Sequence, residues 1–312
     1  MRVIVAGLGV QGHKRRKVAG TDCVATVDPV NLEADFREIG NVPLDRYDAV
    51  LACIPDRPKI ALLNYCVDNC KHMLVEKPLW AERALDIDSL GERARSRQLT
   101  LYTAYNHRFE PHFIRMRNLI ASGVLGRIYR CRMFYGNGTA RLVRESTWRD
   151  HGAGVLSDLG SHLLDTCRFW FGDIGGQFAV TSASCFENRA PDHVVISNEG
   201  ARPRIELEMT LLMWRNHFTC DVLAERGSAH ISSLCKWGPS TFTHRARVLP
   251  SGRPTEQRFV LVEEDSSWMA EYEHFKSLCA SKAESDLSAD VWLHRSLSRM
   301  SVDAIRMAER AS

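Results

Sequence analysis

Two opposite charges stand side by side in the segment Glu76-Lys77-Pro78, directly after the apolar residues Met73 to Val75. The apolar run predicts a buried strand that ends at the charged pair. Pro78 disfavours the helical conformation at Lys77, so the lysine is expected to be extended. Because open α/β sheets bind ligands beyond the carboxyl ends of their strands, we expect Lys77 to face a reacting group.

A second acid–base pair occurs at helical spacing further along the chain. Asp158 and His162 are four residues apart, so on a helix they share one face, with Asp165 on nearly the same side. A carboxylate and an imidazole on one face can perform general acid–base chemistry near neutral pH. The alternative is that the Asp and His form a purely structural pair at a helix start, with their hydrogen bonds satisfied within the protein. Lys77, as a third polar group on a ligand-binding edge, favours the functional interpretation.

A glycine-rich turn follows the first apolar run, Val3 to Ala6. The order of strand, Gly-x-Gly-x-x-Gly, helix, second strand and acid makes this motif informative, whereas the three glycines alone would be weak evidence. Gly7 permits a tight turn, Gly9 lets the backbone approach a pyrophosphate, and Gly12 allows close helix–strand packing. The phosphates would lie at the helix N-terminus, where free N–H groups and the dipole favour anions. A glycine turn in an unrelated α/β protein is the alternative.

Asp28 closes the second strand, sixteen residues after Gly12. Its carboxylate can accept hydrogen bonds from a ribose 2′-hydroxyl and would repel a 2′-phosphate, so NAD is favoured, with NADP still possible. Only about twenty residues separate Asp28 from the next apolar run at Asp48, which predicts an abbreviated adenine side. The basic run Lys14 to Lys17 can assist the phosphates, but most of it is expected to be a solvated helix face.

Composition sets the class of protein. A chain of 312 residues with 45% hydrophobic and 25% charged residues predicts a globular protein of two domains. The net charge of +3 is too small to indicate nucleic acid or an anionic membrane as partner. No apolar run approaches the ~20 residues that span a bilayer. The first strand begins at once, leaving no room for a signal peptide, so we expect a cytoplasmic protein.

The ten cysteines are scattered without a Cys-x-x-Cys pair, which is typical of free thiols in a reducing compartment. Cys66 and Cys70, with His72 nearby, could suggest a metal. Two thiols one helical turn apart more often pack on a helix face, and structural zinc prefers four ligands. We therefore expect no metal.

Strands and helices alternate in the first third of the chain, which predicts a parallel sheet covered on both faces. The expected strands are 3–6, 23–27, 48–54, 72–76 and 99–105, and the expected helices between the later strands are 57–70 and 81–97. After a helix at about 110–122, runs such as 205–211 have apolar residues at every second position, indicating an antiparallel sheet with one packed face. Leu293, Leu297 and Met300 indicate an amphipathic last helix.

Taken in order, these segments resemble the Gfo/Idh/MocA oxidoreductases over essentially the whole chain. The matching pieces are Gly7 to Gly12, Tyr47 to Val50, Glu76 to Pro78, Tyr105 to Pro111, Ser122 to Gly126 and Gly154 to Asp165. The resemblance implies an N-terminal Rossmann domain, a doubly wound parallel sheet, in residues 1–108. It also implies a C-terminal α/β domain with a large open, mainly antiparallel sheet in residues 109–312, whose last helix can pack back on the first domain.

The resemblance further implies an NAD(P)-dependent dehydrogenase. Hydride would pass between nicotinamide and a secondary hydroxyl or ketone of a sugar, polyol or sugar nucleotide, and the sheet would build a homodimer or homotetramer. An NAD-dependent glycosidase that oxidises its substrate transiently is one alternative, distinguished by the absence of net reduced cofactor. A non-catalytic cofactor-binding regulator is another, although a sensor needs no acid–base set.

Carried over residue by residue, the resemblance makes Lys77, Asp158 and His162 the catalytic residues. Lys77 would contact the reacting hydroxyl and the nicotinamide ribose, His162 would take the hydroxyl proton, and Asp158 would bind and orient the substrate. An unperturbed lysine has a pKa of about 10.4 and a histidine about 6.5, so the histidine is the better base at cellular pH. The predicted cofactor-binding residues are Gly7, Gly9, Val10, Gln11, Gly12, Asp28, Cys53, Pro55, Glu76, Lys77, Asn106, Trp148 and Arg149.

Three details complete these expectations. Glu76 would fix Lys77 or lie on the ribose side, and the Lys77–Pro78 bond is cis in many relatives. Where relatives commonly have a histidine, this chain has Asp56-Arg57-Pro58-Lys59. Five arginines lie between the domain junction and the Asp–His helix, and they either bind an anionic substrate such as a nucleotide sugar or line an exposed strand face, the latter being favoured. They are Arg130, Arg132, Arg141, Arg144 and Arg149.

Overall fold

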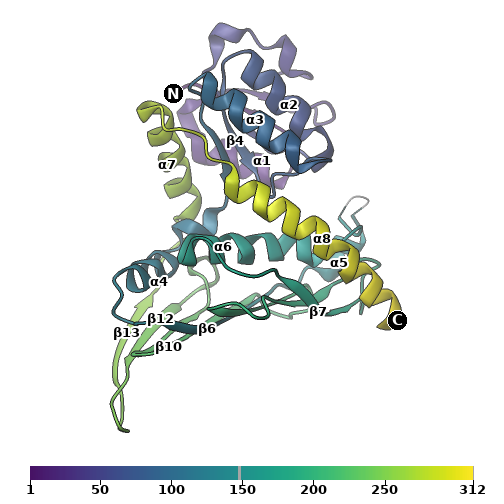
Figure 1. Ribbon diagram of the computed structural model, residues 1–312. Coiled ribbons are helices and arrows are strands. Elements are labelled where there is room, and N and C mark those ends of the chain that lie inside the picture. Colours follow the sequence, from purple (N-terminus) through teal and green to yellow (C-terminus); the bar gives the residue numbers. More distant parts are fainter. Residues whose placement is uncertain (147–148, 312) are drawn as a thin grey trace. The chain divides into compact units, whose positions relative to one another are not determined.

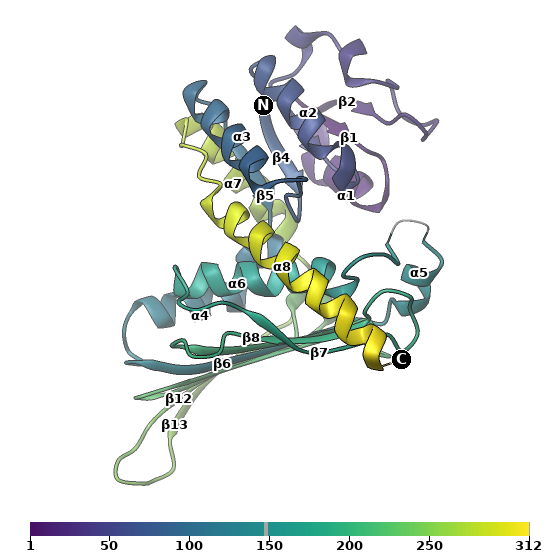
Figure 2. The same cartoon turned by 45° about the vertical axis from the view of Figure 1, so that its right-hand side comes forward.

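The chain folds into two compact units, each with its own sheet. The computed structural model describes residues 1–146 and 149–311, and Figures 1 and 2 show its ribbon. Unit 1 comprises Met1–Asn106 and Ser267–Arg295, and unit 2 comprises His107–Ser266 and Ser296–Ser312. The division into 1–108 and 109–312 stays a prediction, and the structure groups Ser267–Arg295 with the N-terminal part. None of the helices searched, all within the described residues, is long and apolar enough to cross a membrane.

Unit 1 is built on a parallel sheet of five strands in the order β2-β1-β3-β4-β5. The strands are β1 (Val3–Ala6), β2 (Cys23–Val27), β3 (Ala49–Ala52), β4 (His72–Glu76) and β5 (Leu101–Ala104). The helices are α1 (Val10–Ala19), α2 (Asp56–Asp68), α3 (Ala84–Ser96) and α7 (Ser267–Ser281). All residues of β1 and β3 are buried, which confirms the predicted sheet with apolar strands covered on both faces.

The segment between β2 and β3 is short and contains neither an α-helix nor a named strand. Residues 28–48 form two 3₁₀ turns, Ile39–Asn41 and Leu44–Arg46, and a single parallel bridge joins Val27 to Phe36. The common Rossmann order has a further strand outside β2, reached by a helical crossover. The twenty or so residues available here are too few for both elements, as the sequence indicated.

Unit 2 is built on a mainly antiparallel sheet of eight strands in the order β13-β12-β11-β10-β6-β9-β8-β7. Only β6 and β9 pair in parallel among these neighbours. The strands are β6 (Ile128–Gly136), β7 (Ala179–Ser184), β8 (His193–Ser197), β9 (Arg204–Thr210), β10 (His217–Ala224), β11 (Gly227–Ser232), β12 (Ser240–Ala246) and β13 (Thr255–Leu261). This architecture confirms the expected open, mainly antiparallel sheet.

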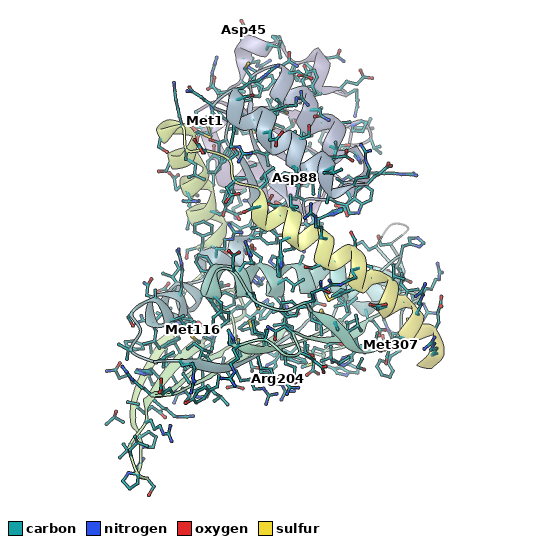
Figure 3. The ribbon with its side chains drawn as sticks, viewed as in Figure 1. Met1, Asp45, Asp88, Met116, Arg204 and Met307 are labelled. Carbon is teal, nitrogen blue, oxygen red and sulfur yellow. The ribbon has the colours of Figure 1, made fainter. Side chains whose placement is uncertain are left out.

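Helices cover one face of the unit 2 sheet. Figures 1 and 2 show α4 (Pro111–Ala121) and α6 (Ser161–Phe171) against that face, while none of the described helices lies on the other. In β9 the buried residues Ile205, Leu207 and Met209 alternate with Arg204, Glu206 and Glu208. Figure 3 labels Arg204 on the side without helices. The remaining helices are α5 (Ala140–Arg144) and α8 (Ser288–Ala311), and α8 contributes residues to both units.

Candidate functional site

The turn after β1 has the shape of a phosphate cradle. Gly7 has φ +91°, and a Cβ there would lie 2.4 Å from the carbonyl oxygen of Cys53. A Cβ on Gly12 would lie 1.8 Å from the carbonyl oxygen of Gly7, so both glycines are required by packing. Gly9 is different, because it is the N-cap of α1 and a Cβ there would meet no atom within 4 Å. The open space at Gly9, over the α1 N-terminus, fits the pyrophosphate of a dinucleotide.

Asp28 ties the end of β2 to this turn. Its Oδ2 accepts the backbone N–H of Leu8 at 2.7 Å, and its Oδ1 accepts those of Val30 and Asn31, each at 2.8 Å. Partial burial would raise the pKa of the Asp28 carboxyl, but these N–H donors lower it below its ordinary value. The carboxylate is therefore ionised and held at the carboxyl edge of the sheet, the place at which a ribose hydroxyl would be recognised.

The segment that follows β4 is anchored by Lys59, a residue to which the sequence analysis assigned no role. The Lys77–Pro78 bond is cis. Lys59 of α2 is 2% exposed, and its Nζ donates to the Pro78 carbonyl oxygen at 2.8 Å and to Asp56 at 2.7 Å. Burial lowers the pKa of Lys59, the Asp56 carboxylate opposes this, and the positive charge of Lys77 lowers it further. Lys59 thus stabilises the backbone just after Lys77.

Glu76 contacts a buried arginine of α1. Arg15 is 1% exposed, its Nε donates to Glu76 at 2.8 Å, and its guanidinium forms a second ion pair with Glu271 of α7 at 2.6 Å. The ring of Trp268 lies 4.3 Å from the Arg15 guanidinium carbon. The sequence predicted a mostly solvated face for Lys14 to Lys17, and this holds for the exposed neighbours but not for Arg15. Helical spacing alone does not reveal a carboxylate that approaches from residue 271.

Other predicted cofactor residues also lie in unit 1. Val10 and Gln11 begin α1 and are exposed, and Cys53 and Pro55 follow β3 at the same carboxyl edge as Gly7. Burial raises the pKa of the Cys53 thiol, so the thiol is protonated. Asn106 is buried, and its Nδ2 donates to Ser267 Oγ at 2.8 Å, which joins the end of β5 to the start of α7.

In unit 2, Asp158 and His162 lie on either side of a change in helix type. Asp158 belongs to a π-helical turn, Leu156–Gly160, and His162 belongs to α6. Such turns are frequent at functional sites. Asp158 Oδ2 accepts a hydrogen bond from Arg149 at 3.0 Å, so two predicted site residues are brought together. Trp148 lies outside the described residues.

His162 packs in an aromatic cluster that the sequence did not predict. It is 8% exposed, and its ring stacks on His107 with centroids 4.1 Å apart and an interplanar angle of 21°. Tyr135 of β6 lies 5.4 Å from His107 and 6.3 Å from His162, measured between ring centroids. These rings fix the plane of the His162 imidazole. His107 was visible in the Asn106-His107-Arg108 motif, but its partner was not.

The remaining acid of this helix and most of the arginines have structural partners. The Arg108 guanidinium binds the carboxylate of Asp165, which is 2% exposed, and burial raises the pKa of that carboxyl while Arg108 opposes the rise. Arg130 and Arg132 pair with acids of β9 on the sheet face without helices, as the favoured interpretation predicted. Arg144 donates to the backbone of residue 187, and Arg141 is an exposed residue of α5.

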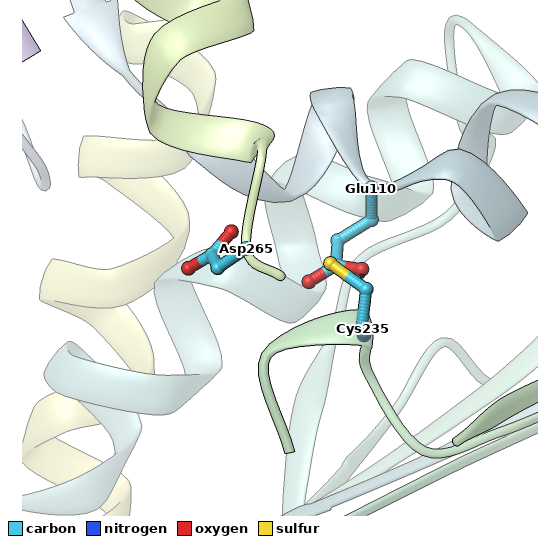
Figure 4. A group of neighbouring side chains, drawn as sticks. All are labelled: Glu110, Cys235 and Asp265. Carbon is cyan, nitrogen blue, oxygen red and sulfur yellow. Dashed lines mark hydrogen bonds between the residues drawn. The ribbon is translucent and has the colours of Figure 1, made fainter. Parts of the chain in front are cut away.

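Figure 4 shows Glu110, Cys235 and Asp265, whose potential ligand atoms lie within 4.8 Å of one another. Glu110 Oε2 accepts the backbone N–H of Cys235 at 3.1 Å. Burial raises the pKa of Glu110, and it raises that of Cys235 to about 12. Burial lowers the pKa of the adjacent Lys236, while Glu110 and Asp265 oppose this. Because Glu110 and Asp265 interact electrostatically with Lys236, we interpret the group as a polar network at this position.

The expected packing of Cys66 and Cys70 on one helix face, near His72, is found only in part. Cys66 is fully buried in the core of unit 1. His72 Nδ1 accepts the backbone N–H of Thr100 at 2.9 Å. All ten cysteines of the chain are free thiols in the structure. Cys70 is exposed and lies beyond the end of α2 at Asp68, so the packing interpretation accounts for Cys66 but not for Cys70.

Comparison with known proteins identifies a family domain in unit 2. The model of the GFO/IDH/MocA C-terminal domain matches residues 113–230, which include most of α4, the Asp158 turn and most of the unit 2 sheet. Residues 113–230 are thereby identified as a GFO/IDH/MocA C-terminal domain. This confirms the resemblance that the motifs indicated.

Two curated relatives show how far the GFO/IDH/MocA resemblance extends in sequence. An uncharacterised oxidoreductase of Schizosaccharomyces pombe is 29% identical over 128 residues, covering 40% of this chain and 34% of its own. Myo-inositol 2-dehydrogenase of Thermotoga maritima is 26% identical over 129 residues, covering 40% of this chain and 36% of its own. The chain thus spans about a third of the length of these relatives.

Solved structures of the same fold cover the whole chain. UDP-N-acetylglucosamine 3-dehydrogenase from Acidithiobacillus ferrooxidans has a TM-score of 0.80 at 17% identity and covers 99% of both chains. Levoglucosan dehydrogenase in complex with NADH has a TM-score of 0.80 at 15% identity, covering 98% of this chain and 97% of its own. At this identity the similarity establishes the fold.

Proposed function

We propose that this protein is an NAD(P)-dependent oxidoreductase acting on a secondary hydroxyl or ketone of a sugar, polyol or sugar nucleotide. The observation that carries the proposal is the carboxyl edge of the unit 1 sheet. The open cradle at Gly9, the ionised Asp28 and Lys77, which precedes the anchored Pro78, all follow strands at that edge. Relatives and structures of the same fold include an inositol dehydrogenase and two sugar dehydrogenases, which supports the substrate class.

In this proposal the chain holds the cofactor through unit 1. The Gly9 backbone and the α1 N-terminus bind the pyrophosphate, and Asp28 binds the adenosine ribose hydroxyls. A carboxylate at this position favours NAD over NADP. Val10, Gln11, Cys53, Pro55, Glu76, Asn106, Trp148 and Arg149 are the further proposed cofactor contacts. When bound, the nicotinamide supplies the hydride acceptor.

The chain's own side chains handle the proton. His162 accepts the proton of the reacting hydroxyl, Lys77 stabilises the developing negative charge on that oxygen, and Asp158 binds and orients the substrate. The His107 ring and Tyr135 hold the imidazole plane. Support for combining these three groups comes from the GFO/IDH/MocA C-terminal domain and from their chemistry.

The cofactor part is tested with Gly9→Ala. Because the Cβ would meet no protein atom, the melting temperature without cofactor is expected to be unchanged, while the shift induced by NAD is expected to shrink. Gly40→Ala is the matched control, since a Cβ there also meets no atom, and it should affect neither value. An undiminished NAD shift in Gly9→Ala would contradict the cradle.

The catalytic part is tested by turnover of a sugar and polyol panel with NAD or NADP. His162→Gln and Lys77→Met are expected to lower kcat by about 10²- to 10⁴-fold with cofactor binding retained. Near-normal turnover in Lys77→Met would refute the assignment. Product formation without net reduced cofactor would indicate the transient-oxidation glycosidase. Cofactor binding without turnover of any compound in the panel would favour a regulator.

Assembly and location are also part of the proposal. We propose a homodimer or homotetramer formed through the helix-free sheet face, which sedimentation analysis will test. Ten free cysteines fit a reducing cytoplasmic location.

A further inference from the structure

Unit 2 contains a groove at one end of its sheet that no proposed role has yet used. It has a volume of about 490 Å³ and is lined by the turn from Leu212 to His217 together with Ser233, Trp237 and Pro239. A cavity of this size lies within the range of small-molecule sites. The groove therefore has room for a sugar-sized ligand.

The turn that lines the groove is held in place by the backbone of β6 and its continuation. Met213 N–H donates to the Asn137 carbonyl oxygen at 3.0 Å, and the Gly138 N–H donates to Asn216 Oδ1 at 3.4 Å. A Cβ on Gly138 would lie 2.3 Å from the Met213 carbonyl oxygen, so the two segments are in close contact. The turn that forms the groove wall is therefore held in a defined position.

Two tryptophans and an arginine give the groove its chemistry. The Trp214 side chain is 104% exposed relative to the reference state, which is unusual for the largest apolar side chain. Trp237 forms another part of the lining, and Lys236 Nζ lies 4.9 Å from its ring centroid. Arg215 adds a positive charge, and among the described lining residues none is acidic. Indole faces suit the C–H faces of a sugar ring, and a guanidinium suits a carboxylate or phosphate.

The groove is connected to the proposed base within the same unit. The Trp237 ring lies 5.7 Å from Tyr135, and Tyr135 lies 6.3 Å from His162, measured between centroids. A ligand held against Trp237 is therefore one aromatic ring away from the residue proposed to accept the hydroxyl proton.

We infer that this groove is the specificity subsite of the enzyme and that it selects a sugar bearing an anionic substituent, with Trp214 and Trp237 against the ring and Arg215 on the anion. The inference deepens the proposed function and rests on it for the reaction. It differs from the arginine cluster considered from sequence, because Arg130 and Arg132 are already paired with β9 acids.

The test compares neutral and anionic sugars within two matched sets. Initial rates with NAD are measured for glucose, glucuronate and glucose 6-phosphate, and for galactose and galacturonate. The wild type is expected to have the higher kcat/KM for an anionic member, and the uronate and phosphate arms show which anion is preferred. Arg215→Gln is expected to lower kcat/KM for the anionic sugars by about 10- to 100-fold and to leave the neutral sugars unchanged.

Arg204→Gln is the matched control, because Arg204 is exposed at the opposite end of β9 from the groove turn. It should leave all rates unchanged. Equal or higher kcat/KM for the neutral sugars in the wild type, or an equal loss for both classes in Arg215→Gln, would overturn the inference. The inference would also be overturned if Trp214→Ala dissociated an oligomer while its KM values stayed unchanged. Trp214 would then contact a second copy of the chain rather than a sugar.

A binding measurement separates this inference from the proposed reaction. Tryptophan fluorescence is titrated with glucuronate and with glucose 6-phosphate in the presence of NAD. Saturable quenching that Arg215→Gln abolishes supports the anion subsite even if no sugar is oxidised, in which case only the proposed reaction fails. Absence of saturable quenching by both anions, with neither oxidised, overturns the subsite.

Discussion

At the scale of single residues, buried and half-buried charges determine the geometry of the carboxyl edge. Lys59 contacts the Pro78 carbonyl oxygen and Asp56, while Asp28 collects three backbone N–H groups. Both side chains act on a backbone segment next to a proposed functional residue. Substituting either residue should therefore change both the free energy of unfolding and the position of that backbone segment. Unfolding and activity measurements on matched variants distinguish the two effects.

Replacing Lys59 by Met removes the donor to the Pro78 carbonyl oxygen. We expect a loss of about 1–3 kcal/mol in the free energy of unfolding, because the acceptor loses its partner. The turn after Lys77 should also shift, and a misplacement of about 1 Å can lower kcat by about 10²-fold. Steady-state kinetics and urea unfolding measure the two effects.

Lys71→Met is the control for Lys59→Met. Lys71, which directly precedes β4, also donates through its Nζ to two carbonyl oxygens, those of Leu44 and Tyr47. It should lower stability without lowering kcat. Equal kcat losses in both variants would contradict a positioning role for Lys59.

The Asp28 carboxylate should contribute stability that depends on pH. Its pKa is lowered in the folded state, so its contribution is present above the unfolded pKa of about 3.9 and is lost as pH falls through the lower folded value. Asp28→Asn should therefore have a lower melting temperature than the wild type at neutral pH, with a difference that narrows in acid. Asp45→Asn, at an exposed position, should show little difference at either pH. A difference in melting temperature between Asp28→Asn and the wild type that did not change with pH would show that the Asp28 charge is not its cause.

At the scale of elements, Arg15 joins three parts of unit 1. Its guanidinium contacts Glu76 at the end of β4 and Glu271 on α7, while its stem belongs to α1. A buried ion pair adds little net stability over an apolar alternative, but removing one partner leaves uncompensated buried charges. The three elements should therefore be energetically coupled through this residue.

Arg15→Met should lower the free energy of unfolding by about 3–5 kcal/mol, because Glu271 and Glu76 lose their cation. Arg16→Met, on the exposed face of the same helix, should change it by no more than about 0.5 kcal/mol. Urea unfolding of both variants measures the difference. The double variant Arg15→Met with Glu271→Gln should recover part of the loss, and strict additivity would show that the pair is not coupled.

At the scale of the whole molecule, the first structural unit is discontinuous in sequence. Ser267–Arg295 belongs to unit 1, where Tyr272 donates to Asp22 at 2.9 Å and Ser285 Oγ accepts the Leu101 N–H at 2.7 Å. Leu287 is part of its core. The N-terminal residues alone therefore lack a helix and several buried partners.

A fragment of residues 1–108 is expected to be unfolded or to unfold with poor cooperativity. It lacks Glu271, the ion-pair partner of Arg15, and Leu287, which is part of the core. Residues 1–106 joined by a flexible linker to 267–295 should unfold cooperatively and bind NAD. Circular dichroism with thermal melting and an NAD thermal shift check both fragments. Cooperative melting and NAD binding by the 1–108 fragment would instead support the division predicted from sequence.

The sequence by itself determined the features that depend on local patterns. Apolar runs alternating with helical segments specify the parallel sheet, the period of two in residues such as 205–211 specifies the second sheet, and the glycine spacing specifies the turn after β1. The short segment after Asp28 likewise limited what could follow β2. Each of these features shows in the order of residue types within a short segment, so each leaves a local signal even where its contacts are long-range.

Only the tertiary structure decided which distant residues meet. It brought Glu271 to Arg15 and stacked His107 on His162, neither of which leaves a periodic signal. It also placed Trp237 beside the turn that contains Arg215, two segments separated by two strands. Long-range contacts depend on how whole elements pack. A charged side chain such as Arg15, which this packing buries, cannot be distinguished in the sequence from one that is exposed to solvent.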